Sequence, residues 1–148
     1  MHAHAESLNR IALSATAHCL TGCAIGEILG LVIATALDWG NAASIALAVV
    51  LAFVFGYSLT FCPLVARVGP RRAARLAFAA DTVSIAVMEL VDNAFVLIMP
   101  GAMEAGLGES LFWWSLAVGL AIAFVVAFPV NRWLVARGRG HAVAHSLH

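Results

Sequence analysis

The stretch AHCLTGCAIGEILG, residues 17–30, decides how the rest of the chain is organised. It lies inside an apolar run over residues 11–37 that is long enough to cross a bilayer as one helix. The run nevertheless contains His18, Cys19, Cys23 and Glu27. An ionisable side chain near the bilayer centre costs about 2.5–3.5 kcal/mol on insertion scales, so these groups indicate a functional site within a membrane helix.

The composition of the whole chain agrees with a membrane protein. Of the 148 residues, 63% are hydrophobic and 11% are charged, and the mean hydropathy is +0.97. Soluble domains average about 45–50% apolar and about 25% charged residues. The composition therefore predicts an integral membrane protein, and the length limits it to one bundle.

Three further apolar runs follow the first, separated by short polar turns. The predicted helices cover residues 11–37, 42–66, 73–99 and 111–136. We therefore predict an all-α fold, an integral membrane four-helix bundle, as a single four-pass domain over residues 1–148 with short polar tails.

The arginines predict the orientation of this bundle. Every cationic residue is an arginine, and all eight lie at residue 10, within 67–75 or within 132–139. The other two turns contain none. The positive-inside rule then places both termini and the turn between the second and third helices in the cytoplasm.

Three glycines on the first helix predict close helix packing. Gly22, Gly26 and Gly30 are spaced four residues apart, which lets another helix backbone approach closely. Packing is the simplest interpretation of the spacing. The neighbour that it brings close would also carry its polar groups to Cys23 and Glu27.

Helical geometry groups the polar side chains of the first helix. At about 100° per residue, Cys19, Cys23 and Glu27 share a face about 100° wide with Gly26 and Gly30. His18 lies about 100° away from Cys19 on the same count. These four side chains therefore form a ladder along the helix, with His18 nearer the arginine-rich end.

The third predicted helix has a matching acidic face in DTVSIAVMELVDN, residues 81–93. Asp81, Met88, Glu89 and Asp92 share one face, with Thr82 and Asn93 at its edge. Counting from the arginines puts His18 level with Asp81, and Glu27 level with Glu89. We therefore expect the first and third helices to face each other, within one chain or across a homo-oligomer.

The charge of this interior indicates a cation or proton site. Glu27, Asp81, Glu89 and Asp92 are acids, and His18 is the base within the two runs. Unpaired carboxylates in a low dielectric do not stay ionised. They must be protonated, be neutralised by a bound cation, or face a water-filled cavity.

The candidate ligands are of two chemical kinds. His18, Cys19, Cys23 and Met88 are soft donors that suit copper or zinc. Carboxylates suit harder ions, and these are Glu27, Glu89 and Asp92. Our leading hypothesis is copper or zinc bound between the first and third helices by these seven residues. Asp81, Thr82 and Asn93 would then be part of an ion pathway or structural polar groups.

Two alternatives stay open at this point. In the first, the protein is a proton or alkali-cation channel in which the cysteines only pack. In the second, it is a non-catalytic assembly or accessory subunit whose glycine face docks another membrane protein. We identify no nucleophile–base triad, phosphate-binding loop or nucleic-acid patch, so we predict neither an enzyme nor a nucleic-acid partner. The expected partners are the lipid bilayer and further copies of the chain.

Four segments of the chain resemble one family. They are HCLTGCAIGE (18–27), DTVSIAVMELVDN (81–93), FPVNRW (128–133) and RGRGHAV (137–143). Together they resemble a bacterial family of small four-helix membrane proteins catalogued only as a domain of unknown function. The resemblance covers nearly the whole chain after about residue 16 and supports the four-pass architecture. We expect this bundle to lie in a bacterial inner membrane. It implies no activity and no functional residues.

Overall fold

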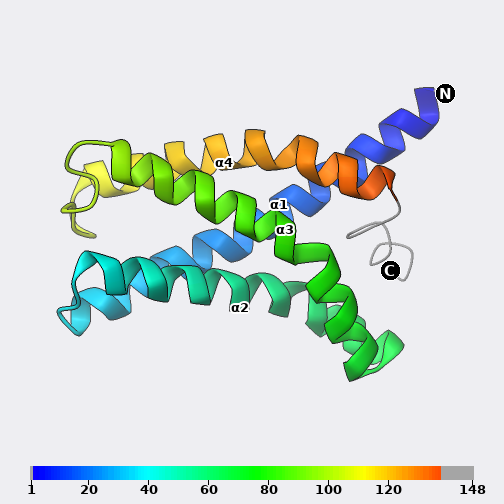
Figure 1. The fold of residues 1–148 in the computed structure, drawn as a ribbon, viewed down its shortest axis with the longest axis horizontal. Helices are drawn as coiled ribbons and strands as arrows, with labels where there is room; N and C mark the ends of the chain where they lie inside the picture. Colours follow the sequence, from blue (N-terminus) through cyan, green and yellow to red (C-terminus); the bar gives the residue numbers. More distant parts are fainter. Residues whose placement is uncertain (1, 138–148) are drawn as a thin grey trace.

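The computed structural model describes residues 2–137 and contains four long helices. These are α1 (His2–Ala36), α2 (Asn41–Val68), α3 (Pro70–Ile98) and α4 (Ser110–Ala136). Consecutive helices run antiparallel and pack against one another, and α4 closes the bundle against α1 (Figure 1). The all-helical four-helix fold predicted from the sequence is confirmed for the described residues.

The first helix is longer than its apolar run. It starts at His2, whereas the sequence predicts a polar tail before residue 11. No glycine or proline occurs in the first ten residues, so nothing there interrupts the helical backbone. The other helices lie close to their predicted ranges. Residues 138–148, which include Arg139, lie outside the described part of the chain.

The arginine-bearing segments meet at one end of the bundle. Gly69 forms the tight connection between α2 and α3 with a φ of +84°, a backbone conformation that glycine adopts without strain. Pro70 then occupies the first turn of α3. This turn lies at the same end as the start of α1 and the end of α4 (Figure 1). The α1–α2 turn and the α3–α4 loop lie at the opposite, arginine-free end.

The glycine ladder of α1 packs against α2. A Cβ atom built on Gly22 would lie 2.7 Å from the Cα atom of Gly56, and one on Gly30 would lie 2.7 Å from the Cα atom of Ala48. Between them, Gly26 sits against the backbone of Ala52. Small residues at four-residue spacing thus occur on both helices, and their backbones touch along this line.

The helix α3 buries its three acids and exposes several large apolar residues. Glu89 is only 4% exposed, whereas the adjacent Leu90 is 73% exposed. Asp81 and Asp92 are also buried, and Val83 lies on the outer surface. A surface helix in water usually shows the opposite arrangement, and this distribution agrees with the apolar composition of the bundle.

Three of the described helices meet the length and composition expected of membrane spans. These are α1 over residues 5–36, α2 and α4. The helix α3 has 29 residues, enough for a span, but carries more charged groups than the other three. The prediction of a membrane-like bundle is therefore supported for three helices, and α3 depends on its neighbours to enclose its acids.

Candidate functional site

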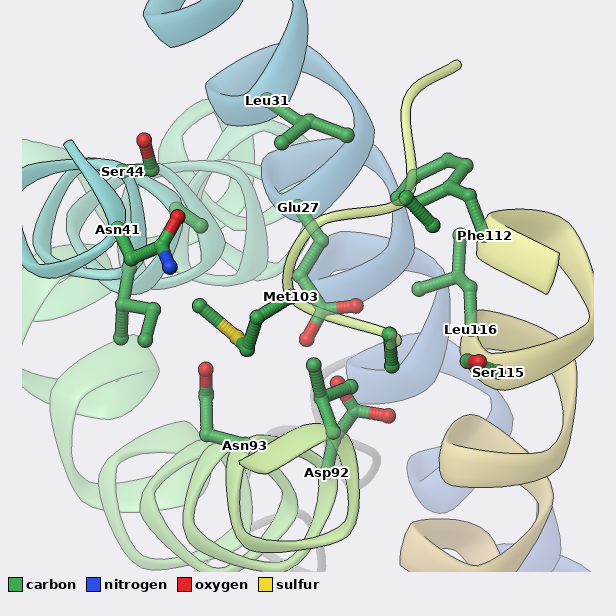
Figure 2. Close-up of a pocket in the computed structure, with 15 residues that line it drawn as sticks. Glu27, Leu31, Asn41, Ser44, Asp92, Asn93, Met103, Phe112, Ser115 and Leu116 are labelled. Atoms are coloured by element: carbon green, nitrogen blue, oxygen red, sulfur yellow. The ribbon is translucent and has the colours of Figure 1, made fainter. Parts of the chain in front are cut away.

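Two carboxyl groups from opposite helices share a cavity near the arginine-free end. The cavity has a volume of about 110 Å³ and is lined by Glu27 of α1 and Asp92 of α3. Figure 2 shows the two carboxyl groups pointing toward one another, with Met103 of the α3–α4 loop beside them. The sequence predicts that α1 and α3 face each other. They do so diagonally across the bundle, with α2 and α4 between them as the closer neighbours of α1.

The acids at this level are deeply buried and incompletely hydrogen-bonded. Glu27 is 9% exposed and Asp92 is 3% exposed. Both carboxyl oxygens of Glu27, one of Asp92 and one of Glu89 have no hydrogen-bond partner among the described residues. A buried polar atom without a partner is destabilising, so each of these oxygens needs a proton, a water molecule or a cation.

A missing side chain on α4 makes room for Asp92. A Cβ atom built on Gly119 would collide with the Oδ1 atom of Asp92. The same Cβ atom would lie 3.2 Å from a ring carbon of Phe95. Glycine at position 119 therefore lets the Asp92 carboxyl group reach the centre of the bundle.

Glu89 lies one turn deeper than Asp92 and has an amide neighbour. The Nδ2 atom of Asn93 donates to the Glu89 Oε2 atom over 3.3 Å and to the Glu89 carbonyl oxygen over 2.8 Å. Asn93 also lines the cavity. The thiol of Cys23 lies next to the Glu89 carboxyl group. Glu89 thus connects the cavity to the sulfur-containing core.

The sulfur atoms lie in the apolar centre of the bundle. Cys19, Cys23 and Met88 belong to one buried cluster that also contains Ile85 and small residues of α2 and α4. The Cys19 thiol points at the Asp81 Oδ1 atom over 3.8 Å. Two of the predicted soft ligands therefore each have an acid as a neighbour, Cys23 with Glu89 and Cys19 with Asp81.

A second polar network lies at the arginine-rich side of this cluster. The Nδ2 atom of Asn131 on α4 donates to the hydroxyl oxygens of Thr16 and Ser84, each over 3.0 Å. All three residues are fully buried. The network joins α1, α3 and α4, and Cys19 lies beside Ser84.

Two of the predicted site residues, His18 and Thr82, lie outside the cavity, the sulfur cluster and the Asn131 network. His18 hydrogen-bonds through Nε2 to the Thr60 hydroxyl group over 3.0 Å, which continues the α1–α2 ladder by one step. Thr82 accepts a 2.7 Å hydrogen bond from Tyr57 between α2 and α3, because its own proton is donated to the Phe78 carbonyl oxygen. Among residues 5–137, no three His, Cys, Asp or Glu side chains are grouped so that they could hold a metal ion.

Comparison with known proteins identifies the family of the chain. Residues 9–140 match the family model described as a domain of unknown function, DUF4396. The chain belongs to the DUF4396 family. The resemblance to an uncharacterised family seen in the sequence is thereby confirmed. No curated protein and no solved structure matches the chain.

Several residues of this DUF4396 protein that shape the site are not among the site residues predicted from its sequence. Gly119, Ser84, Thr16 and Asn131 each support a polar side chain in the interior. Asn131 has a sequence signal, since an amide within an apolar run next to Pro129 is unusual. Gly119 has none, because a lone glycine in an apolar helix does not reveal which neighbour fills its space.

Proposed function

We propose that this protein is a four-pass membrane protein that binds or moves a cation through the centre of its bundle. The orientation proposed is that of the positive-inside rule, with both termini in the cytoplasm of a bacterial inner membrane. The outward-facing apolar surface of α3 and the separation of arginines to one end support this arrangement. The role is binding or movement, and we assign no chemical reaction.

One observation carries the proposal, the pair of buried carboxyl groups at Glu27 and Asp92. Three of their four oxygens lack a hydrogen-bond partner among the described residues, and both groups line the same cavity. Two adjacent carboxylates in a low dielectric repel each other and lose their hydration. A cation between them, including a shared proton, removes both penalties.

The donors around this cavity favour a hard cation over a soft one. Glu27 and Asp92 offer oxygen, and His18 is directed to Thr60 away from the cavity. Copper or zinc stays a second candidate at a different place. Cys19, Cys23 and Met88 pack together in one buried cluster, and thiol and thioether groups are the ligands that Cu(I) prefers.

An accessory-subunit role has less support than cation binding. The glycine ladder that would dock another membrane protein is covered by α2 of the same chain. Assembly into a homo-oligomer would have to use another surface, and the exposed apolar residues of α3 and α4 are available for it.

The experiment that tests the proposal is a stability screen of detergent-purified protein. Thermal unfolding is followed across a panel of Na⁺, K⁺, Mg²⁺, Mn²⁺, Zn²⁺ and Cu⁺ salts and across pH. A bound cation stabilises by about 2.7 kcal/mol when its concentration is a hundred times the Kd. We expect stabilisation that is lost in Glu27→Gln and Asp92→Asn.

The matched control for this screen is Glu104→Gln, the same chemical change at an exposed loop position of the same end. It should respond to cations as the wild type does. Stabilisation by Zn²⁺ or Cu⁺ that disappears in Cys19→Ser/Cys23→Ser would favour the soft-metal candidate. No response of any kind that depends on Glu27 or Asp92 would refute the proposed site.

A further inference from the structure

We infer that the cation held between Glu27 and Asp92 is a hard divalent ion that keeps part of its hydration shell. This inference rests on the proposed function, since it names the class of cation for that same site. It depends on three properties of the cavity: its charge, its donor atoms and its size.

The charge of the cavity matches two positive charges. Glu27 and Asp92 are the ionisable side chains among the described residues that line it, and no arginine or histidine lines it. The described arginines belong to segments at the other end of the bundle. A divalent ion neutralises both carboxylates, whereas a monovalent ion leaves one negative charge buried.

The other polar side chains of the cavity, two amides (Asn41 and Asn93) and two hydroxyl groups, all carry oxygen atoms suited to a hard ion. Ser44 of α2 and Ser115 of α4 line it, and each hydroxyl proton is donated to a carbonyl oxygen of its own helix or cap, Gly40 or Leu111. The lone pairs of both hydroxyl oxygens therefore remain available. Carboxylate, carbonyl and water oxygens suit Mg²⁺, Ca²⁺ and Mn²⁺.

Sulfur and imidazole donors are nearly excluded from the cavity. Met103 supplies a thioether, but no cysteine or histidine is among the described lining residues. Cys23 lies deeper, next to Glu89. The cavity thus differs in chemistry from the sulfur cluster, and an ion bound here would not need the thiols.

The size of the cavity leaves room for water around the ion. Its volume is about 110 Å³, whereas a cavity needs only about 10–15 Å³ of such space to hold one water molecule. Magnesium dehydrates reluctantly and is commonly held by one or two carboxylates together with several waters. Two carboxylates in a cavity of this volume fit that mode.

The test is a titration of detergent-purified, chelator-treated full-length protein with Mn²⁺. Free hexaaqua Mn²⁺ is counted by its electron paramagnetic resonance signal, which broadens on binding. We expect about one bound Mn²⁺ per chain, displaced by Mg²⁺ and not by Na⁺ or K⁺ at equal ionic strength. Glu27→Gln and Asp92→Asn should each weaken binding at least tenfold.

Two control variants distinguish a specific loss of Mn²⁺ binding from a general loss of the fold. Glu104→Gln and Cys19→Ser/Cys23→Ser should bind Mn²⁺ as the wild type does. Each variant is also required to retain its helical circular dichroism and its elution volume. Ser115→Ala removes a hydroxyl group without changing the charge, and we expect it to weaken binding by less than either acid variant.

The alternative outcomes separate this inference from the proposed function. Mn²⁺ binding that is absent, or unchanged in both acid variants, overturns the divalent inference. If Na⁺, K⁺ or protons then stabilise the protein in a way that depends on Glu27 and Asp92, the proposed function stands without it. If no cation does so, both are overturned.

Discussion

The Oδ1 atom of Asp92 on α3 occupies the space that a side chain at Gly119 of α4 would fill. Two positions that are 27 residues apart in the chain (92 and 119) therefore depend on each other. The glycine lets the acid reach the cavity, and the acid fills the gap that the glycine leaves. This relationship makes the identity of residue 119 a condition for the proposed cation site.

Gly119→Ala should therefore damage both stability and binding. The added methyl group must displace the Asp92 carboxyl group, and overpacking of a filled core costs about 1–3 kcal/mol. We expect a lower unfolding temperature and Mn²⁺ binding weakened at least tenfold. Gly108→Ala is the control, since a Cβ atom there meets nothing within 4 Å. Full Mn²⁺ binding by Gly119→Ala would contradict this account of Asp92.

The α1–α2 contact leads to a prediction about stability alone. A Cβ atom at Gly26 would collide with the backbone of Ala52, which cannot rotate away as a side chain can. We expect Gly26→Ala to lower the free energy of unfolding by about 1–3 kcal/mol and Gly26→Leu to lower it further. Denaturant unfolding in detergent measures the change. Gly106→Ala, where a Cβ atom meets no neighbour within 4 Å, should leave it unaltered.

The polar network of Asn131, Thr16 and Ser84 predicts a moderate loss of stability when Asn131 is replaced. Its amide makes two hydrogen bonds, to Thr16 and Ser84. Such bonds between membrane helices average about 0.6 kcal/mol each, with a maximum near 1.7. Asn131→Leu should therefore destabilise the bundle by roughly 1–2 kcal/mol on those values. Ser14→Ala removes an exposed hydroxyl group on α1 and should have no measurable effect. An Asn131→Leu variant as stable as the wild type would show that the network does not hold the bundle together.

Sequence reasoning recovers the helices and the acidic interior but not which neighbours meet. Counting depth from the arginines predicts that Glu27 lies level with Glu89, and the structure brings Glu27 to Asp92, one turn away. Helical periodicity defines the face on which Gly26 lies. It does not say that α2 covers that face, because every helix here has small residues and the choice depends on the tertiary arrangement.

His18 is a second residue whose contacting helix the sequence does not predict. Its residue type and depth predict a metal ligand in a ladder with the cysteines, and in the structure its Nε2 atom hydrogen-bonds to Thr60 of α2. The reason is rotational: His18 lies about 100° from Cys19 around the helix. It therefore faces α2, along the line that Gly22 continues, while Cys19 faces the centre.

His18→Leu should consequently behave like Thr60→Val. Each variant removes the same hydrogen bond, so each should destabilise the protein by about 0.6–1.7 kcal/mol. The double variant should cost less than the sum of the two single ones, because both single variants remove the hydrogen bond between His18 and Thr60. Neither should change Mn²⁺ affinity more than twofold. Loss of a bound copper or zinc ion in His18→Leu but not in Thr60→Val would assign His18 a ligand role.

The orientation of the bundle can be tested by labelling a single cysteine placed at one end or the other. In a Cys19→Ser/Cys23→Ser/Cys62→Ser background, a single cysteine is introduced as Glu104→Cys or as Arg71→Cys, both exposed positions. Because the arginines should remain in the cytoplasm, a membrane-impermeant maleimide applied to spheroplasts should label only the first variant. The second should react only after the membrane is opened. The reverse pattern would place the Glu27–Asp92 cavity nearer the cytoplasm, so that a cation would enter this site from inside the cell. Labelling of both variants in intact spheroplasts would mean that α3, the helix between the two positions, does not cross the membrane, as its three acids would explain.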